Sequence, residues 1–126
     1  MERIEVNIKK TITVTQEDID DIMCSALEGG ISYWCNKPEV VDEYLGEYAS
    51  EQISRGGALK LYDAEEDKVY TLTKDKLLNG IKLAIERDYY PVYQWHYGNE
   101  LDTCEIDAEV ADTIVQLALF SDIIYG

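Results

Sequence analysis

The chain has 126 residues, of which 46% are apolar, and its 26 Asp and Glu against 11 Lys and Arg give a formal net charge of −15. This length and composition predict one domain over residues 1–126 with a sizeable core, and they argue against global disorder. The negative charge disfavours direct binding to nucleic acid or to an anionic membrane and favours partners with basic surfaces, although solubility alone also explains an acidic surface.

The excess of acidic residues lies in two blocks of the chain. Residues 16–66 contain 13 acidic and three basic residues, and residues 91–126 contain seven acidic residues and no Lys or Arg. No apolar run reaches the length of a membrane span, and the N-terminus does not resemble a signal peptide. Three cysteines without a Cys-x-x-Cys pair are typical of reduced thiols, so we expect a cytoplasmic protein.

Two elements are predicted in the first 30 residues. Residues 2–14 have the alternation of a strand, with apolar side chains on one face: Ile4, Val6, Ile8, Ile12 and Val14. Thr15 is a good N-cap for a helix that Gly29 and Gly30 end. The apolar residues of this helix have helical spacing: Ile19, Ile22, Met23, Ala26 and Leu27.

The middle of the chain predicts a β-hairpin preceded by short elements. Residues 31–35 are strand-like, residues 36–38 form a turn, and residues 39–54 fit two helical turns around Gly46. The hairpin pairs residues 59–62 with residues 69–72 across an acidic tip.

The last third predicts two helices joined by an aromatic loop. Thr73 caps the first helix, whose exposed side is basic, and Asp107 caps the second, which is apolar nearly all round and therefore central. The fold class expected for the whole chain is α+β: a small antiparallel sheet, made of the N-terminal strand and the central hairpin, packed against about three helices.

No motif for catalysis, cofactor binding or metal binding stands out, so the sequence predicts a protein that is not an enzyme. Cys24, Cys35, Cys104 and His96 lack the close ligand pairs of a structural zinc site. The acidic hairpin tip lacks the glycine and the final glutamate of a calcium loop.

Two stretches offer candidate ligand contacts. Arg55, Gly56 and Gly57 could hold an anion between a guanidinium group and backbone N–H groups, although glycines that end a helical turn fit as well. The aromatic loop, with Tyr93 and Trp95, is the better candidate, because Tyr and Trp are enriched where proteins meet partners or stack on bases. A loop folded over the core is equally consistent with its sequence.

Three stretches together resemble a family of small acidic proteins encoded by phages and prophages of Gram-positive gut bacteria. They are residues 12–35 (ITVTQEDIDDI running to YWC), residues 47–57 (EYASEQISRGG) and residues 106–126, which begin IDAEVAD. The resemblance covers most of the chain except the aromatic loop, and it supplies no catalytic residues. It implies a phage accessory protein inside a bacterial cell, and by analogy an inhibitor of host defence.

The expected function is therefore a binding protein that blocks a host defence system in the manner of an anti-CRISPR protein, with acidic patches occupying a basic nucleic-acid-binding surface. The candidate partner-binding residues are Glu17, Asp18, Asp20, Asp21, Glu28, Asp63, Glu65, Glu66 and Asp67. One alternative is a sponge for a nucleotide immune signal, held by Arg55 and the aromatic loop. Another is an accessory protein of phage nucleic-acid metabolism. Apolar surface not covered by the last helix would also allow a homodimer.

Overall fold

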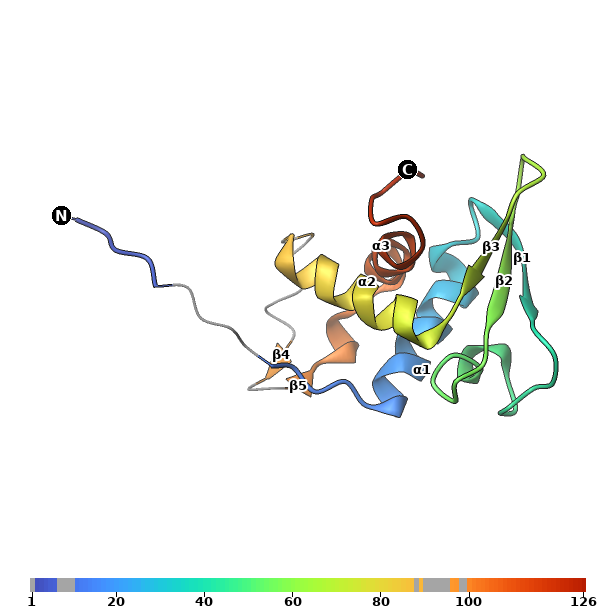
Figure 1. Cartoon of the computed structure of the whole chain (residues 1–126), viewed down its shortest axis with the longest axis horizontal. Helices are drawn as coiled ribbons and strands as arrows, with labels where there is room; N and C mark the ends of the chain where they lie inside the picture. Colours follow the sequence, from blue (N-terminus) through green and yellow to red (C-terminus); the bar gives the residue numbers. More distant parts are fainter. Residues whose placement is uncertain (1, 7–10, 88, 90–95, 98–99) are drawn as a thin grey trace.

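The computed structural model describes residues 2–6, 11–87, 89, 96–97 and 100–126, and these confirm the α+β class. Three helices pack beside a three-stranded antiparallel sheet (Figure 1). The elements in chain order are α1 (Gln16–Ser25), the π-helical turn η1 (Ala26–Gly30), β1 (Cys35–Val40), the 3-10 turn η2 (Ala49–Glu51), β2 (Leu59–Asp63), β3 (Val69–Leu72), α2 (Lys74–Glu86), β4 (His96–Tyr97), β5 (Glu100–Leu101), the 3-10 turn η4 (Thr103–Glu105) and α3 (Ala108–Phe120).

Helix α1 begins where its sequence predicts. The Thr15 hydroxyl accepts a hydrogen bond from the Asp18 N–H at 3.1 Å, and the Asp18 carboxylate accepts one from the Thr15 N–H at 2.9 Å. This reciprocal cap satisfies two backbone donors that would otherwise lack partners at the start of the helix. The buried residues of α1 are those of the predicted apolar face: Ile19, Ile22 and Met23.

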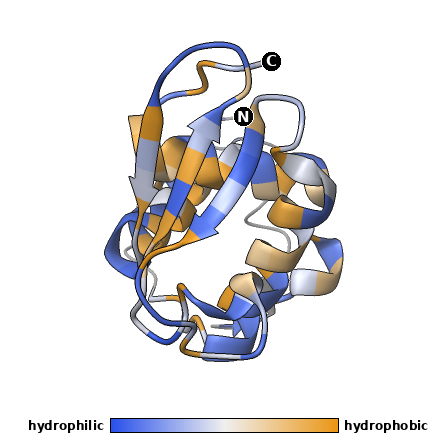
Figure 2. Cartoon of the chain, turned by 90° about the vertical axis from the view of Figure 1, so that its right-hand side faces the viewer, coloured by the Kyte–Doolittle hydropathy of each residue, from blue (hydrophilic) through white to orange (hydrophobic). Residues whose placement is uncertain are grey.

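The sheet has the order β1-β2-β3, and its hairpin β2-β3 confirms the predicted strands. Figure 2 shows the three strands facing the viewer, with β2 between its two neighbours. On β2 the buried Leu59 and Leu61 alternate with the half-exposed Lys60 and Tyr62, because successive side chains of a strand point to opposite faces.

The third strand is β1, and the prediction that the N-terminal segment joins the sheet is wrong. Residues 2–6 form no strand, Ile4 and Val6 are each 80% exposed, and Thr13 makes a single isolated bridge to Glu100. Residues 7–10 lie outside the described residues. The alternation correctly marks an extended segment with an apolar side, but it does not say which strand the segment meets.

The prediction of a strand over residues 31–35 and a turn over 36–38 is also wrong. Residues 32–34 form a turn, and the strand runs through Pro38, which lies opposite Leu61. Proline lacks a donor for the ladder, but β1 is an edge strand and can face solvent on its other side. Residues 41–48 likewise form bends instead of the first predicted helical turn, whereas the second is present as η2 and the turns up to Gly56.

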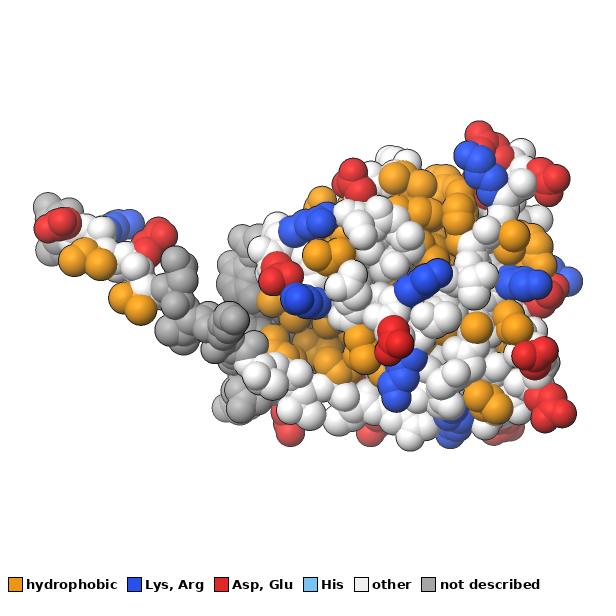
Figure 3. Space-filling view, in the orientation of Figure 1, with side chains coloured by type: hydrophobic (Ala, Val, Ile, Leu, Met, Phe, Trp, Pro, Cys, Tyr) orange, Lys and Arg blue, Asp and Glu red, His pale blue; other side chains and the backbone are white. Residues whose placement is uncertain are grey.

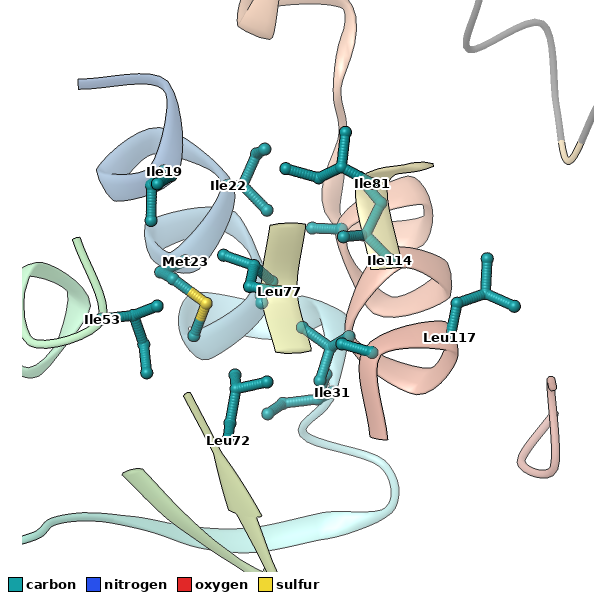
Figure 4. Packing of buried hydrophobic residues seen from close by; sticks show 14 of the residues in the cluster. Ile19, Ile22, Met23, Ile31, Ile53, Leu72, Leu77, Ile81, Ile114 and Leu117 are labelled. Carbon is teal, nitrogen blue, oxygen red and sulfur yellow. The ribbon is translucent and has the colours of Figure 1, made fainter. Parts of the chain in front are cut away.

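Helix α3 is the central helix, as its apolar sequence predicts. Every residue from Val110 to Ala118 is buried, and α3 packs along α2 and against η1. Figure 4 shows Ile114 of α3 facing Ile81 and Leu77 of α2 within the main cluster of buried side chains. In the part of the chain that the structure describes, no helix has both the length and the apolarity to span a bilayer.

Candidate functional site

The five acidic candidates of the first helical segment, four on α1 and one on η1, divide into residues with a role in the fold and residues open to solvent. Asp18 belongs to the helix cap, Asp20 accepts a hydrogen bond from the Ser54 hydroxyl, and the exposed Asp21 accepts one from the Thr103 hydroxyl at 2.9 Å. Glu17 and Glu28 are exposed, one at each end of the helical segment. We therefore regard Glu17 and Glu28 as the carboxylates of the α1 and η1 segment most available to a partner.

The acidic candidates at the hairpin tip divide in the same way. The Asp63 carboxylate accepts hydrogen bonds from the N–H groups of Glu65 and Glu66, both at 2.8 Å, and so shapes the turn. Glu66 forms an ion pair with Lys68 at 2.8 Å, on the surface. Glu65 and Asp67 are exposed. The tip projects at the upper right of Figure 1, far from the start of α1 at the bottom, so the two acidic groups form separate patches.

Asp63 also receives a hydrogen bond from the hydroxyl of Tyr125, near the end of the chain. This hydroxyl lowers the pKa of the Asp63 carboxyl from its ordinary value of 3.8, and the N–H groups of Glu66 and Glu65 lower it further. Burial and the Asp63 carboxylate raise the pKa of Tyr125, whose hydroxyl also bonds the hydroxyl of Tyr70 at 2.8 Å. The C-terminal tail is thus tied to the hairpin by a charge-assisted hydrogen bond.

We expect Tyr125→Phe to raise the pKa of Asp63 towards 3.8 without reaching it, because the two backbone N–H groups still donate. A carboxyl whose pKa is lower in the folded state than in the unfolded state stabilises the fold at pH values above its ordinary pKa. This stabilisation is lost as the pH falls through the pKa that the carboxyl has in the folded state. The variant should therefore be less stable than the wild type at neutral pH, and the difference should shrink below about pH 4.

Carboxyl 13C NMR titration measures the pKa of Asp63. Urea unfolding at neutral pH and below about pH 4 measures the difference in stability. Tyr44→Phe is the matched control, since Tyr44 is 61% exposed on a different loop. An unchanged pKa of Asp63 in Tyr125→Phe would contradict the assignment of its cause to the Tyr125 hydroxyl.

Arg55 is paired within the fold. Its guanidinium group lies 3.5 Å from the Glu51 carboxylate and 3.9 Å from that of Asp20. Gly56 has a φ of +91°, which suits the end of a helical turn. A hollow of about 520 Å³ beside Gly56 and Gly57 has Asp42 and Glu43 in its wall, and its described lining includes no Lys or Arg.

The geometry around Arg55 therefore does not favour an anionic ligand at the two glycines. Tyr93 and Trp95, the other candidate ligand contacts, lie outside the described residues. No observation in the described part of the chain favours the nucleotide sponge over the binding protein.

An aromatic and polar network that the sequence did not predict joins α3 to the C-terminal tail. The Asp112 carboxylate is 7% exposed and accepts hydrogen bonds from the Trp34 indole N–H at 2.7 Å, the Tyr33 hydroxyl at 2.6 Å and the Gln116 amide at 3.0 Å. The Tyr125 ring stacks on Trp34 with ring centres 4.7 Å apart. One signal was visible in the sequence: Asp112 and Gln116 are polar residues four positions apart in an apolar helix.

The loop of residues 41–48, which we call the Gly46 loop, is held from inside by two side chains. The Glu51 carboxylate accepts hydrogen bonds from the N–H groups of residues 47 and 48 at 2.9 and 3.0 Å. The buried Gln52 amide accepts from the residue 45 N–H at 3.0 Å and donates to the residue 43 carbonyl at 3.1 Å. The large hydrophobic side chains that this loop exposes are Tyr44, Leu45 and Tyr48.

The three cysteines are free thiols, and the structure does not bring them together as metal ligands. Cys24 is half-buried, Cys35 buried and Cys104 exposed. Burial raises the pKa of the Cys35 thiol, and burial followed by Glu28 raises that of Cys24, so both are protonated at neutral pH. Among the described residues, no group of three His, Cys, Asp or Glu side chains is placed to hold a metal ion. The side chain of His96 lies outside the description.

Comparisons of the chain with protein-family models, with curated proteins and with solved structures find no match. The resemblance to acidic phage-encoded proteins therefore stays a prediction from the sequence.

Proposed function

We propose that the chain is a binding protein whose surface carboxylates occupy a basic, nucleic-acid-binding surface of a partner. In the setting that the resemblance implies, this partner is a CRISPR nuclease or another host defence protein. The inhibited partner would then be unable to load the nucleic acid that its basic surface normally holds.

The surplus of carboxylates carries this proposal. Pairing each of the 11 Lys and Arg with one of the 26 acidic residues would still leave 15 carboxylates without a cation. Figure 3 shows carboxylates at the hairpin tip and along the lower right edge of one face, with Lys and Arg side chains interspersed among the carboxylates over the rest of that face. A surplus of one sign creates a field around the molecule that steers a partner of opposite charge.

The exposure and the contacts of the acidic side chains identify which acids to test. Glu17, Glu28, Glu65 and Asp67 are exposed and lie on α1, its η1 extension or the hairpin tip. Among the described residues, their carboxylates accept no backbone hydrogen bond and form no ion pair. We call these four the exposed acidic set. Asp18, Asp20 and Asp63 hold backbone or side-chain groups in place, so reversing their charge would confound binding with folding.

Reversing the four residues of the exposed acidic set to Lys should abolish inhibition. Phage plating on a bacterium whose CRISPR immunity targets that phage measures this: the wild-type chain should restore plaques, and the reversed variant should give no more plaques than the empty vector. Long-range attraction between acidic and basic surfaces also predicts that binding weakens as salt increases.

The matched control reverses four exposed acids elsewhere to Lys and gives the same net charge: Glu2, Glu5, Asp75 and Glu86. This control variant should keep the plating of the wild type. Full plating by the variant of the exposed acidic set would contradict the proposed function.

A further inference from the structure

A largely apolar hollow of about 360 Å³ lies where the end of α1 meets the Gly46 loop and η2. Its walls come from the last turns of the α1 segment and from the residues that follow Gly46: Cys24, Leu27, Glu28, Tyr48, Ala49 and Ser50. Cys24, Leu27 and Ala49 are half-buried, and their exposed parts form the apolar floor.

One wall of the hollow is an aromatic side chain on a backbone that hydrogen bonds hold in place. Tyr48 is 61% exposed, and its backbone N–H is fixed by the Glu51 carboxylate at 3.0 Å. Glu51 is itself held by Arg55 at 3.5 Å, and Arg55 also reaches Asp20 of α1. The backbone that presents Tyr48 is therefore ordered before any partner arrives, and binding there costs less conformational entropy.

Carboxylates border the apolar floor. Glu28 lines the hollow and Glu47 precedes Tyr48, and both are exposed. Asp21 lies three residues before Cys24, and Glu17 lies four residues before Asp21. These spacings place both carboxylates on the same face of α1 as Cys24. Protein interfaces concentrate their binding energy in apolar anchor sites that are surrounded by a polar rim.

We propose that this hollow receives an apolar side chain, of the size of Leu or Phe, from a basic segment of the partner protein. The charges of the rim select the occupant, because Lys or Arg on either side of the apolar residue would lie against Glu28, Glu47 and the acidic face of α1. A second copy of the chain is the less suitable occupant, since each copy carries a net charge of −15. This inference rests on the proposed function and adds an anchor to it.

Titration of the full 15N-labelled chain with two peptides tests the anchor. One peptide is Lys-Arg-Lys-Leu-Phe-Lys-Arg-Lys, and the other has Ser in place of Leu and Phe. The first peptide should bind about tenfold more tightly than the second, the difference expected when such an apolar side chain is buried. Its chemical-shift changes should concentrate on the residues that line the hollow.

Two tyrosine variants locate the anchor on the chain. Tyr48→Ala should weaken binding of the Leu-Phe peptide about tenfold. Tyr44→Ala should change it by less than about twofold, because Tyr44 is equally exposed on the same loop but does not line the hollow. Both side chains are exposed, so both variants should keep the wild-type NMR spectrum outside the loop.

The outcomes separate the anchor from the proposed function. Equal affinity for the two peptides, or equal losses in the two tyrosine variants, would overturn the anchor and leave the attraction to basic surfaces in place. Failure of both peptides to bind at low salt would contradict the proposed function itself.

Discussion

Asp112→Ala is expected to lower the free energy of unfolding by about 3 kcal/mol. Asp112 is 7% exposed and is the acceptor for the Trp34 indole N–H, which lies in a side chain that is 3% exposed. Removing the carboxylate leaves this buried donor without a partner, and it also removes hydrogen bonds to Tyr33 and Gln116. An unsatisfied buried donor costs more than the lost bond itself contributes.

Urea unfolding followed by tryptophan fluorescence measures this effect. Asp112→Asn keeps one acceptor oxygen and should lose less than half as much stability as Asp112→Ala. Glu105→Ala removes an exposed carboxylate just before α3 and should stay within about 0.5 kcal/mol of the wild type. If Asp112→Ala were as stable as Glu105→Ala, the network around Trp34 would not stabilise the fold.

Gly80→Ala is expected to destabilise the protein by about 2 kcal/mol, although alanine is normally the better helix former. A Cβ atom at Gly80 of α2 would lie 2.5 Å from the Ile114 carbonyl oxygen and 2.8 Å from the Ala118 Cβ on α3. The nearest of these atoms belongs to the backbone of the central helix, which cannot rotate away. The two helices would have to separate, and this loosens the core between them.

Thermal unfolding of Gly80→Ala and Gly29→Ala provides a matched comparison. A Cβ atom at Gly29 would meet nothing within 4 Å, so this substitution should be neutral or slightly stabilising through reduced flexibility of the unfolded chain. A Gly80→Ala variant as stable as Gly29→Ala would show that α2 and α3 are not packed as closely as described.

The helices and the hairpin could be predicted from the sequence because their signals are local. Thr15, Thr73 and Asp107 accept hydrogen bonds from the first turns of the helices that they precede. The apolar residues of α1 and α2 follow the helical period, and the two strands of the hairpin are joined by a short polar tip. Each signal acts within a few residues, so it does not depend on the rest of the fold.

The third strand of the sheet could not be predicted, because strand pairing is decided by distant residues. Pro38 is unfavourable in most strands, and only the position of β1 at the edge of the sheet makes it acceptable. The alternating N-terminal segment has the better strand pattern, yet Ile4 and Val6 are 80% exposed. Local pattern alone does not distinguish these two candidates for the same place in the sheet.

For the candidate site too, residue types could be predicted from the sequence, whereas contacts with distant residues could not. The acidic residues were visible in the sequence, but their division into structural and exposed groups depends on Ser54, Thr103 and Tyr125, which come from elsewhere in the chain. The contact between Trp34 and Asp112 spans 78 positions. The hollow between α1 and the Gly46 loop likewise exists only once η2 has packed against α1.

Calorimetric titration of two charge variants with the Leu-Phe peptide is the most direct test that the exposed acidic set, and not the total charge, binds a basic partner. Both variants have four acids reversed and the same net charge, one in the exposed acidic set and the other at Glu2, Glu5, Asp75 and Glu86. We predict that the first loses at least about tenfold in affinity and the second less than about threefold. Equal losses in the two variants would contradict specific binding through the exposed acidic set.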